Sequence, residues 1–274
     1  MSPVPQRVIA MVNNKGGVGK TTCALNIAAG LARKSRRVLI IDTDPQANAS
    51  LVLLGAKLFE LPHSIYDILL EPDRHIREIV IPTPIAGLDL APSQTSLANA
   101  ELNLASVRGR ERVLRRSMAQ GLEDYQYILI DCPPSLGLLT INALLAAGEV
   151  YIPIAMTYLA LEGVGQVMDA IEAVKRDLEH PALTITGVIP TFFDGRTRLS
   201  KEILQSVRDY FGEVVFDTPI RKNVKLDEAQ SHHQSIFDYA PRSAGALEYE
   251  SLVEEVIQRE STALGRESPR QTPG

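Results

Sequence analysis

The sequence is poor in cysteine and carries no excess of positive charge. Its two cysteines, Cys23 and Cys132, form no C-x-x-C pair, which argues against a disulfide framework, a zinc site or a metal cluster ligated within one chain. The net charge of −5 excludes a uniformly basic coat for nucleic acid. Any contact with DNA therefore requires a local basic patch.

Long apolar runs are also missing. No stretch approaches the length of a membrane-spanning helix, and the first residues, M-S-P-V-P-Q-R, lack the charged and apolar regions of a secretory signal. We therefore expect a cytoplasmic protein with no membrane partner.

The chain has enough apolar residues for one sizeable core. Its 274 residues are 45% hydrophobic, which suits a single α/β domain. The last ten residues, G-R-E-S-P-R-Q-T-P-G, are polar and contain proline, which favours disorder. The sequence thus predicts one domain over residues 1–262 and a disordered polar tail over 263–274.

A glycine-rich segment near the N-terminus has the pattern of a phosphate-binding loop. The apolar run Val8–Val12 predicts a strand, and three glycines then lead to Lys20 and the helix expected over Cys23–Arg33. Glycines let phosphate oxygens approach backbone N–H groups, while the helix N-terminus points at the anion. In this motif, Lys20 would reach the β- and γ-phosphates and the Thr21 hydroxyl would hold Mg²⁺.

Apolar and amphipathic runs predict the remaining elements. The expected strands are Val38–Ile41, Ile79–Ile81, Leu88–Leu90, Tyr127–Asp131, Glu149–Ile154 and Leu183–Pro190. The expected helices are Ser64–Leu70, Ser93–Leu104 with Ser93 as its N-cap, Leu136–Ala147, Val164–Leu178 and Ser243–Glu260.

Aspartates end two of the buried strands. Asp42 and Asp44 follow the strand from Val38, where an open α/β sheet binds its ligands. Asp44 precedes Pro45, so turn formation alone would explain it, and action on a water beside the γ-phosphate is the alternative. Asp131 ends an apolar strand in the Walker B arrangement and would hold a Mg²⁺-bound water or Thr21.

These motifs resemble those of the ParA/MinD ATPases. The string K-G-G-V-G-K-T-T is similar to their deviant Walker A motif, with Asn14 at the first glycine of an ordinary P-loop and a second lysine at Lys15. The strings D-T-D-P-Q-A-N, D-C-P-P-S and T-Y-L-A-L-E-G match further family signatures. The resemblance implies a doubly wound, mostly parallel sheet with helices on both faces, in a deviant P-loop NTPase.

The resemblance also assigns roles to residues. Lys15 would cross a dimer interface to the partner's nucleotide, Asp44 would polarise the attacking water, and Asp42 would belong to the Mg²⁺ shell. Glu162 would lie near the interface and nucleotide, although a first-turn acid of a helix explains it nearly as well. The expected catalytic residues are Lys15, Lys20 and Asp44; the ATP ligands are Lys15, Gly16, Gly17, Val18, Gly19, Lys20, Thr21, Thr22, Glu162, Pro190 and Thr191; the Mg²⁺ residues are Thr21, Asp42 and Asp131.

A segment of the final third is locally basic. Residues 191–225 hold seven Lys or Arg against five Asp or Glu, which suits either phosphate contacts or a solubilising surface. The resemblance favours nonspecific double-stranded DNA, with contacts from Arg196, Arg198, Lys201, Arg221 and Lys225. A second group, Arg108, Arg112, Arg115 and Arg116, is better explained as a solvated helix face.

Together these expectations describe an ATPase that dimerises around Mg-ATP, binds DNA in that state and positions a chromosome, plasmid or protein assembly at the nucleoid. A ParB-like or cargo-adaptor protein would stimulate hydrolysis. The alternatives are a MinD-like membrane regulator, disfavoured by the short polar tail, and a protein-organelle positioning ATPase. A related GTPase would need a separate N-K-x-D motif, and the sole Asn-Lys pair lies in the P-loop itself.

Overall fold

The computed structural model describes residues 6–71, 73–104, 107–158 and 163–265. Its strands are β1 (Arg7–Met11), β2 (Val38–Asp42), β3 (Ile81–Pro82), β4 (Leu88–Ala91), β5 (Tyr127–Asp131), β6 (Glu149–Ala155) and β7 (Thr184–Thr191). They form one sheet in the order β3-β4-β2-β5-β1-β6-β7, in which every neighbouring pair is parallel except β3 with β4.

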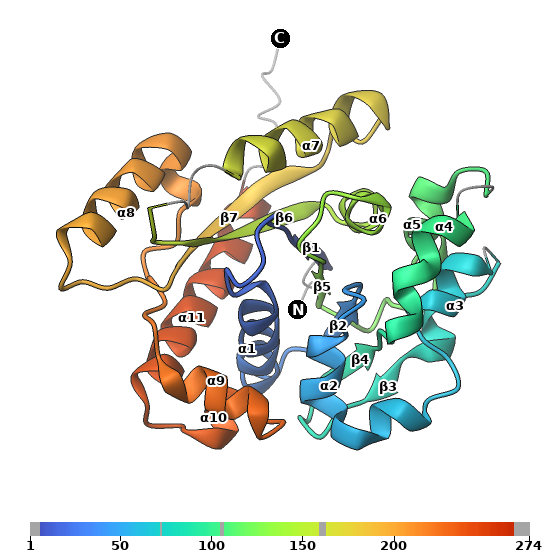
Figure 1. The fold of residues 1–274 in the computed structure, drawn as a ribbon, viewed down its shortest axis with the longest axis horizontal. Helices are drawn as coiled ribbons and strands as arrows, with labels where there is room; N and C mark the ends of the chain where they lie inside the picture. The colour runs from blue at the N-terminus through green and yellow to red at the C-terminus, as the bar shows by residue number, and fades with distance from the viewer. Residues whose placement is uncertain (1–5, 72, 105–106, 159–162, 266–274) are drawn as a thin grey trace, which may run out of the picture.

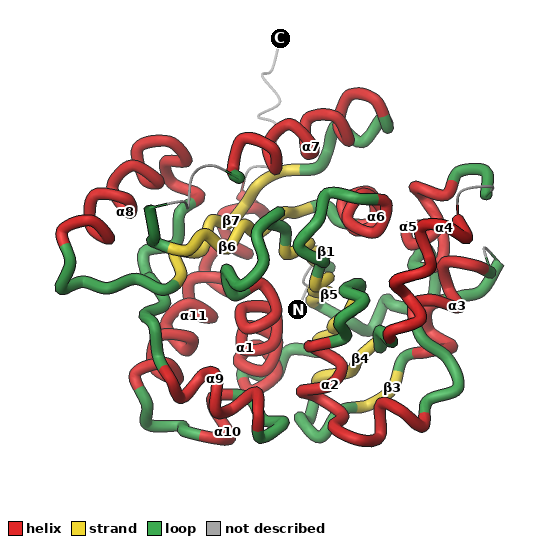
Figure 2. Tube along the Cα trace, in the orientation of Figure 1, coloured by secondary structure: helices red, strands yellow, loops and turns green. Residues whose placement is uncertain are grey.

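Helices cover both faces of this sheet (Figures 1 and 2). One face packs against α1 (Lys20–Arg33), α2 (Asn48–Leu54), α9 (Val224–Ser231), α10 (Ile236–Tyr239) and α11 (Ala244–Gly265). The other packs against α3 (Ile65–Leu70), α4 (Ala100–Asn103), α5 (Val113–Ser117), α6 (Leu138–Ala146), α7 (Val164–Asp177) and α8 (Arg198–Phe211). The expected doubly wound α/β fold is confirmed.

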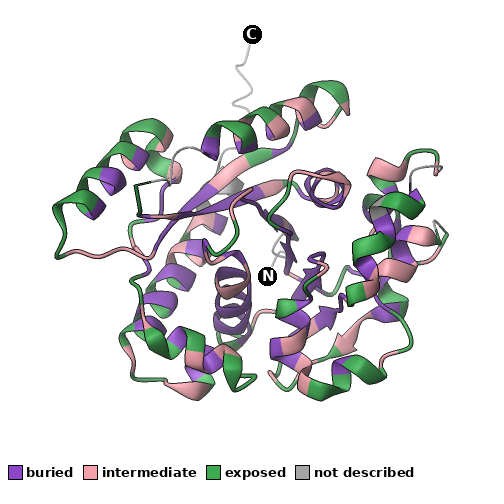
Figure 3. Ribbon diagram, in the orientation of Figure 1, coloured by how far each residue is buried: buried purple, intermediate pink, exposed green. Residues whose placement is uncertain are grey.

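Double coverage explains why the central strands are continuous apolar runs. In β1, Ile9 and Met11 belong to one hydrophobic core, and Ala10 belongs to the core on the opposite face. Successive side chains of a strand point to opposite faces, so both sets must be apolar when both faces are covered. Figure 3 shows the resulting burial along the central strands.

Several boundaries differ from the expectations. Helix α1 begins three residues earlier, at Lys20, and α11 continues past Glu260 to Gly265. Residues Ile76–Ile79 form a 3₁₀ helix, so β3 begins only at Ile81. Helices α2, α8, α9 and α10 were not among the expected elements.

The expected helix from Ser93 is also wrong at its start. A 3₁₀ helix over Thr95–Asn99 precedes the short α4, and Ser93 does not cap it. The Ser93 hydroxyl instead donates to the backbone oxygen of Asp44, because that acceptor lies beside it in the fold although it is distant in sequence.

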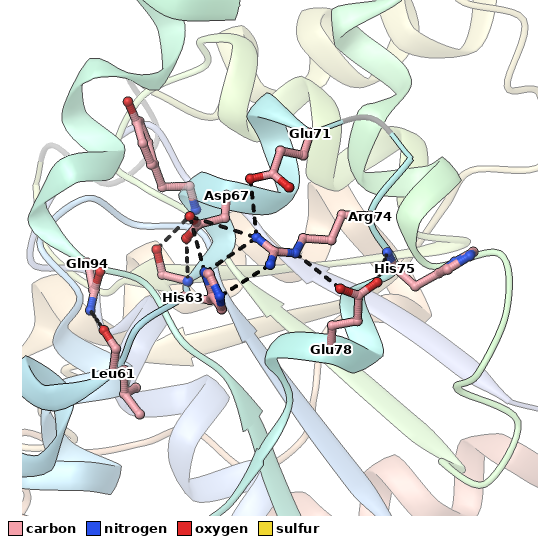
Figure 4. A network of polar contacts seen from close by, with 10 residues as sticks. Leu61, His63, Asp67, Glu71, Arg74, His75, Glu78 and Gln94 are labelled. Carbon is pink, nitrogen blue, oxygen red and sulfur yellow. Dashed lines mark hydrogen bonds and ion pairs between the residues drawn. The ribbon is translucent and has the colours of Figure 1, made fainter.

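The segment between α3 and β3 is held by Arg74 (Figure 4). Its guanidinium pairs with Glu71 at 3.3 Å and with Glu78 at 3.2 Å, and its terminal nitrogens face the His63 ring. This network ties the end of α3 to the 3₁₀ helix after it.

Among the described residues, no helix has the length and apolar character needed to cross a membrane.

Candidate functional site

The loop after β1 is fixed from inside by Asn13. This buried side chain donates from Nδ2 to the Pro153 oxygen at 2.8 Å and accepts the Lys15 N–H on Oδ1 at 3.0 Å. On the other side, the Thr191 hydroxyl donates to the Val18 oxygen at 2.8 Å. The loop is therefore anchored to both β6 and β7 before any ligand binds.

Two glycines give the loop its curvature. Gly17 has φ 71° and Gly19 has φ 90°, a left-handed conformation that strains any residue with a Cβ atom. Gly19 directly precedes α1, and none of the side chains that the structure describes caps that helix. The first-turn N–H groups, near the half-buried Thr21 and Thr22, therefore remain available to an anion at the positive end of the helix.

Lys20 lies inside the loop. Its side chain is buried, and Nζ donates to the Lys15 oxygen at 2.9 Å. Burial lowers the pKa of Lys20, while attraction to Asp131 opposes that effect. An ammonium has three donors, so a phosphate beside Lys20 would restore the solvation that burial removes.

The sheet register places two aspartates side by side. Asp42 of β2 and Asp131 of β5 are Cα partners, and Met11, the last residue of β1, is level with Asp131 on its other side. Since parallel strands in register point their paired side chains to the same face, both carboxylates meet beneath the P-loop. The register therefore brings both aspartates to the edge at which an open α/β sheet binds its ligands.

Asp131 is the member of this pair whose charge is not compensated by hydrogen bonds from the described residues. Its side chain is fully buried, and neither carboxylate oxygen has a hydrogen-bond partner in the part of the chain that the structure describes. Burial raises the pKa of Asp131 well above its usual value, Asp42 acts in the same direction, and Thr21 and Lys20 offset it only in part. A buried carboxylate without donors fits a nearby cation.

Magnesium is the cation that these residues suit. Mg²⁺ is usually bound through one or two carboxylates together with substrate phosphates and waters. Within the described ranges, no three His, Cys, Asp or Glu side chains form a cluster that could hold a metal ion. Thr21, Asp131 and nucleotide phosphates together would supply the oxygen ligands or their water contacts.

Asp42 already has protein partners. Its Oδ2 accepts from both the N–H and the hydroxyl of Ser50, at 2.9 and 2.7 Å, and its Oδ1 accepts the Asp44 N–H at 3.1 Å. Burial nevertheless raises the pKa of Asp42 to about 6. These contacts make Asp42 an anchor for the loop that follows β2, and its place in the Mg²⁺ shell stays a prediction.

Asp44 lies at the start of that loop. It is buried, and its Oδ1 accepts the Gln46 N–H at 2.9 Å, as expected of an aspartate before a turn. Its charge also acts on Lys20. Both the turn role and proximity to the phosphate site therefore apply to the same carboxylate.

A small pocket opens beside the start of α1. Its walls are Gly19, Thr22, Thr191, Phe192, Ile220, Arg221, Lys222, Asn223, Leu226, Asp227 and Tyr249. Thr191 is one of these wall residues and Pro190 is not, and the expected contact of either residue with the base stays a prediction. The Thr22 hydroxyl accepts from Gln230 of α9, which ties this helix to the P-loop. Glu162 lies outside the described residues.

The wall formed by residues 220–227 was not predicted, because the charged side chains of this segment equally suit a DNA-binding surface. The same segment contributes the apolar Ile220 and Leu226 to the core, which its sequence pattern contains but does not assign to a pocket.

The seven basic residues between 191 and 225 are exposed or half-buried, and five of them have a carboxylate partner. Arg196 pairs with Asp194, Arg198 with Glu202, Arg208 with Asp217, Arg221 with Glu248 and Lys225 with Glu228. Glu248 is mostly buried, whereas Glu202 is exposed. Lys201 is exposed on α8. The other arginine group, Arg108, Arg112, Arg115 and Arg116, is also exposed, as expected of a solvated surface.

Known proteins share this sequence and fold. A family model described as an AAA domain matches residues 6–185. The sporulation initiation inhibitor protein Soj of Bacillus subtilis is 43% identical over 250 residues, covering 91% of this chain and 98% of Soj. The chromosome-partitioning ATPase Soj of Treponema pallidum is 41% identical over 254 residues, covering 93% and 98%.

A solved structure agrees with these relatives. Cobyrinic acid a,c-diamide synthase from Mycobacterium smegmatis, with bound ATP analog and magnesium, superposes with a TM-score of 0.81 at 35% identity, covering 97% of this chain and 100% of that one. The loop geometry, the buried Asp131 without a hydrogen-bond partner among the described residues, and these comparisons agree on a Mg²⁺-dependent ATPase. The chain belongs to the ParA/Soj family of P-loop ATPases.

Proposed function

We propose that this ATPase is a nucleotide-timed switch that positions a cargo on DNA. Two copies dimerise around two Mg-ATP molecules, the dimer binds double-stranded DNA without sequence preference, and hydrolysis separates the copies and releases the DNA. The observation that carries the proposal is the anchored loop with two lysines, Lys15 and Lys20. The chromosome-partitioning relatives favour a chromosome or plasmid as the cargo, with a ParB-like partner that stimulates hydrolysis.

Nucleotide binding begins at the loop. Backbone N–H groups from Gly16 to Thr22 surround the phosphates, and Lys20 adds its positive charge. Thr21 and Asp131 would hold Mg²⁺, which when bound would neutralise charge on the phosphate oxygens. The pocket lined by Thr191 and Phe192 takes the base.

Hydrolysis requires a water aligned with the γ-phosphate. Asp44 orients that water, since phosphoryl transfer depends on positioning and electrostatic stabilisation more than on proton removal. The Asp44 carboxylate is held by Gln46 and its backbone by Asp42, so it approaches the phosphate site from a fixed direction.

Dimerisation follows from Lys15. Lys15 also lines a groove at the outer side of the loop with Gly16, Gly17 and Lys222. In the proposed dimer this lysine reaches the partner's nucleotide, so ATP binds the dimer more tightly than the monomer and shifts the population towards it. Two weak DNA-binding surfaces then act together, and their effective concentration multiplies the affinity.

DNA contacts would come from exposed cations. The pair of Arg198 with Glu202 is largely exposed, so a DNA phosphate can replace the carboxylate at little cost. Arg221 donates to the mostly buried Glu248 through both its backbone and its side chain, which favours a structural role for it. The contacts thus rest chiefly on Arg196, Arg198, Lys201 and Lys225.

Turnover measurements test the catalytic assignment. Lys20→Ala and Asp44→Ala should each reduce ATP hydrolysis by about 100-fold or more, as removal of a group that stabilises or positions the transition state does. Lys57→Ala, at an exposed lysine outside the loop, is the control and should retain full turnover. Unchanged hydrolysis in either loop variant would exclude its role.

Sedimentation tests the switch. Wild-type protein should change from monomer to dimer when Mg-ATP is added, and Lys15→Gln should stay monomeric while it still binds nucleotide. Lys57→Gln has the same charge change and should dimerise normally. A Lys15→Gln dimer of wild-type affinity would remove the two-lysine argument.

A further inference from the structure

We propose that two buried serines, Ser93 and Ser50, are positioning residues for ATP hydrolysis because they fix the backbone on which Asp44 stands. This inference rests on the proposed action of Asp44 on water. It adds residues that neither touch the nucleotide site nor belong to the P-loop and aspartate motifs.

Two hydrogen-bonded arms start at Ser93, one from its hydroxyl and one from its backbone N–H. Ser93 Oγ donates to the Asp44 oxygen at 2.7 Å, and the Ser93 N–H donates to Ser50 Oγ at 2.9 Å. Ser50 Oγ then donates to Asp42 Oδ2 at 2.7 Å. A hydroxyl has one proton, so each serine orientation is set by its single acceptor.

The two arms hold the Asp44 backbone from both ends. Asp42, where the hydrogen bonds end, accepts the Asp44 N–H on its other oxygen at 3.1 Å. The Asp44 backbone is thus held at its N–H by one strand residue and at its oxygen by Ser93. Both serines are fully buried, so water cannot replace a lost bond without entering the core.

Sheet pairing explains why Ser93 reaches this loop. It follows β4, which pairs in parallel with β2, so the segments after both strands leave the sheet at the same edge. Its neighbours are also anchored: the Pro92 oxygen accepts the Ile65 N–H at 2.9 Å, and Gln94 Nε2 donates to the Leu61 oxygen at 3.1 Å, as drawn in Figure 4. Ser93 is therefore held in place by its neighbours, and its hydroxyl fixes the position of the loop that carries Asp44.

The functional consequence concerns the rate and not the affinity. A misplacement of about 1 Å in a positioning group can cost about 100-fold in rate. The phosphate loop is held separately by Asn13 and Thr191, so nucleotide affinity should not depend on the serines. Loss of the hydrogen bonds from Ser93 and Ser50 should lower kcat and leave the Kd for ATP unchanged.

The test compares Ser93→Ala and Ser50→Ala with Ser117→Ala in the full chain. Ser117 is likewise buried, and its hydroxyl donates to the Leu114 oxygen at 2.8 Å in α5, so its loss removes a comparable bond elsewhere. We expect single-turnover hydrolysis to fall about 10-fold or more in the first two variants, with ATP affinity within twofold of wild type. Ser117→Ala should lose stability alone.

A double variant examines whether the serines act as a unit. Because Ser93 holds the Asp44 oxygen and Ser50 holds Asp42, which accepts the Asp44 N–H, both act on one backbone, and the combined substitution should slow hydrolysis by less than the product of the two single effects. If the two losses of rate multiply, the serines act independently, and the proposal that they hold one backbone together is wrong.

The outcomes separate this proposal from the role of Asp44. If Asp44→Ala is inactive while folded Ser93→Ala and Ser50→Ala hydrolyse ATP at the wild-type rate, the positioning proposal fails and Asp44 keeps its role. If Asp44→Ala keeps full turnover, both fail. Should Ser93→Ala not fold, Ser50→Ala alone decides, since Asp42 Oδ2 still accepts the backbone N–H of residue 50.

Discussion

At the scale of single residues, the two buried carboxylates below the loop have opposite surroundings. Asp42 accepts three hydrogen bonds and orders the segment that carries Asp44, whereas Asp131 accepts none from the described residues. At the same edge of the sheet, Asp42 therefore stabilises the following loop, and Asp131 is suited to bind a cation. The cost of keeping both carboxylates charged should appear in the stability of the nucleotide-free protein.

The first prediction concerns pH. Burial raises the pKa of Asp42 to about 6 and raises that of Asp131 as well, whereas an unfolded aspartate titrates near about 3.9. Between these values the folded chain binds protons that the unfolded chain does not. The free energy of unfolding of the nucleotide-free protein should therefore rise as the pH falls from 7.5 through 6, with a limiting slope of about 1.4 kcal/mol per pH unit for each group.

Urea unfolding at pH 7.5, 6.5 and 5.5 without Mg²⁺ or nucleotide would measure this slope. The pair of Asp194 and Arg196 stays ionised throughout, because hydrogen bonds from Arg196 lower the pKa of Asp194 to about 2. Lower stability at pH 5.5 than at 7.5 would contradict the prediction.

The second prediction concerns Asp131→Asn. This substitution removes the uncompensated charge at nearly constant size, so the nucleotide-free protein should gain about 1–3 kcal/mol of stability. The additional stabilisation that Mg-ATP gives the wild-type protein should shrink, because the Mg²⁺-linked carboxylate is gone. Thermal unfolding with and without Mg-ATP measures both changes.

Asp209→Asn provides the comparison for that variant. Asp209 is exposed on α8, where the same loss of charge should change neither quantity noticeably. A destabilised Asp131→Asn that keeps its full response to Mg-ATP would argue against an unpaired carboxylate awaiting a cation.

At the scale of elements, the helix that begins at the P-loop depends on one close approach. A Cβ atom added at Gly30 of α1 would lie 2.6 Å from a Val253 methyl of α11 and 3.2 Å from the Phe237 ring. Val253 is fully buried and stiff at χ1, so it cannot move aside easily. Gly30 thus sets the distance between α1 and α11. It thereby also sets the position of α1, the helix that begins at Lys20.

The third prediction follows from that contact. Gly30→Ala should destabilise the protein by about 1–3 kcal/mol through overpacking, although alanine is the better helix former. Gly165→Ala should have the opposite sign, because Gly165 is exposed in α7 and no atom of the described residues lies within 4 Å of the added Cβ, so it should stabilise by about 0.4–1 kcal/mol. Urea unfolding distinguishes the two, and equal effects would contradict the packing argument.

Helices and strands could be predicted from the sequence where their burial requires a simple pattern of apolar residues. The strand Tyr127–Asp131 was expected with both of its bounds, since a strand covered on both faces must be apolar throughout. Helix α8 was not among the expected elements although Ile203, Leu204 and Val207 have helical spacing, because charged residues dominate the rest of the segment. Ser93 could not be placed from local rules, since its acceptor on Asp44 lies 49 residues away.

At the scale of the whole molecule, the proposed DNA surface and the nucleotide site lie on different elements. Helix α8 packs Ile203, Leu204 and Val207 against the sheet, which leaves Arg198 and Lys201 exposed to solvent. In Figure 1 this helix lies at the left, beside β7, and apart from the C-terminal end of α7. Because α8 follows β7, and β7 holds the loop through Thr191, the surface and the site share one strand.

The fourth prediction reverses charge on α8. The combined substitution Arg198→Glu and Lys201→Glu should weaken binding of the ATP-loaded protein to arbitrary duplexes by about 10-fold or more, and should reduce the slope of log affinity against log salt by about 0.9 for each lost phosphate contact. Lys175→Glu with Arg176→Glu, near the C-terminal end of α7, makes the same change in net charge at another surface. Duplex titrations at several salt concentrations should then separate the two pairs. Equal losses of affinity in the α8 and α7 variants would indicate that net charge alone governs binding. If the α8 variant kept its affinity and salt slope, DNA would have to contact a surface other than α8.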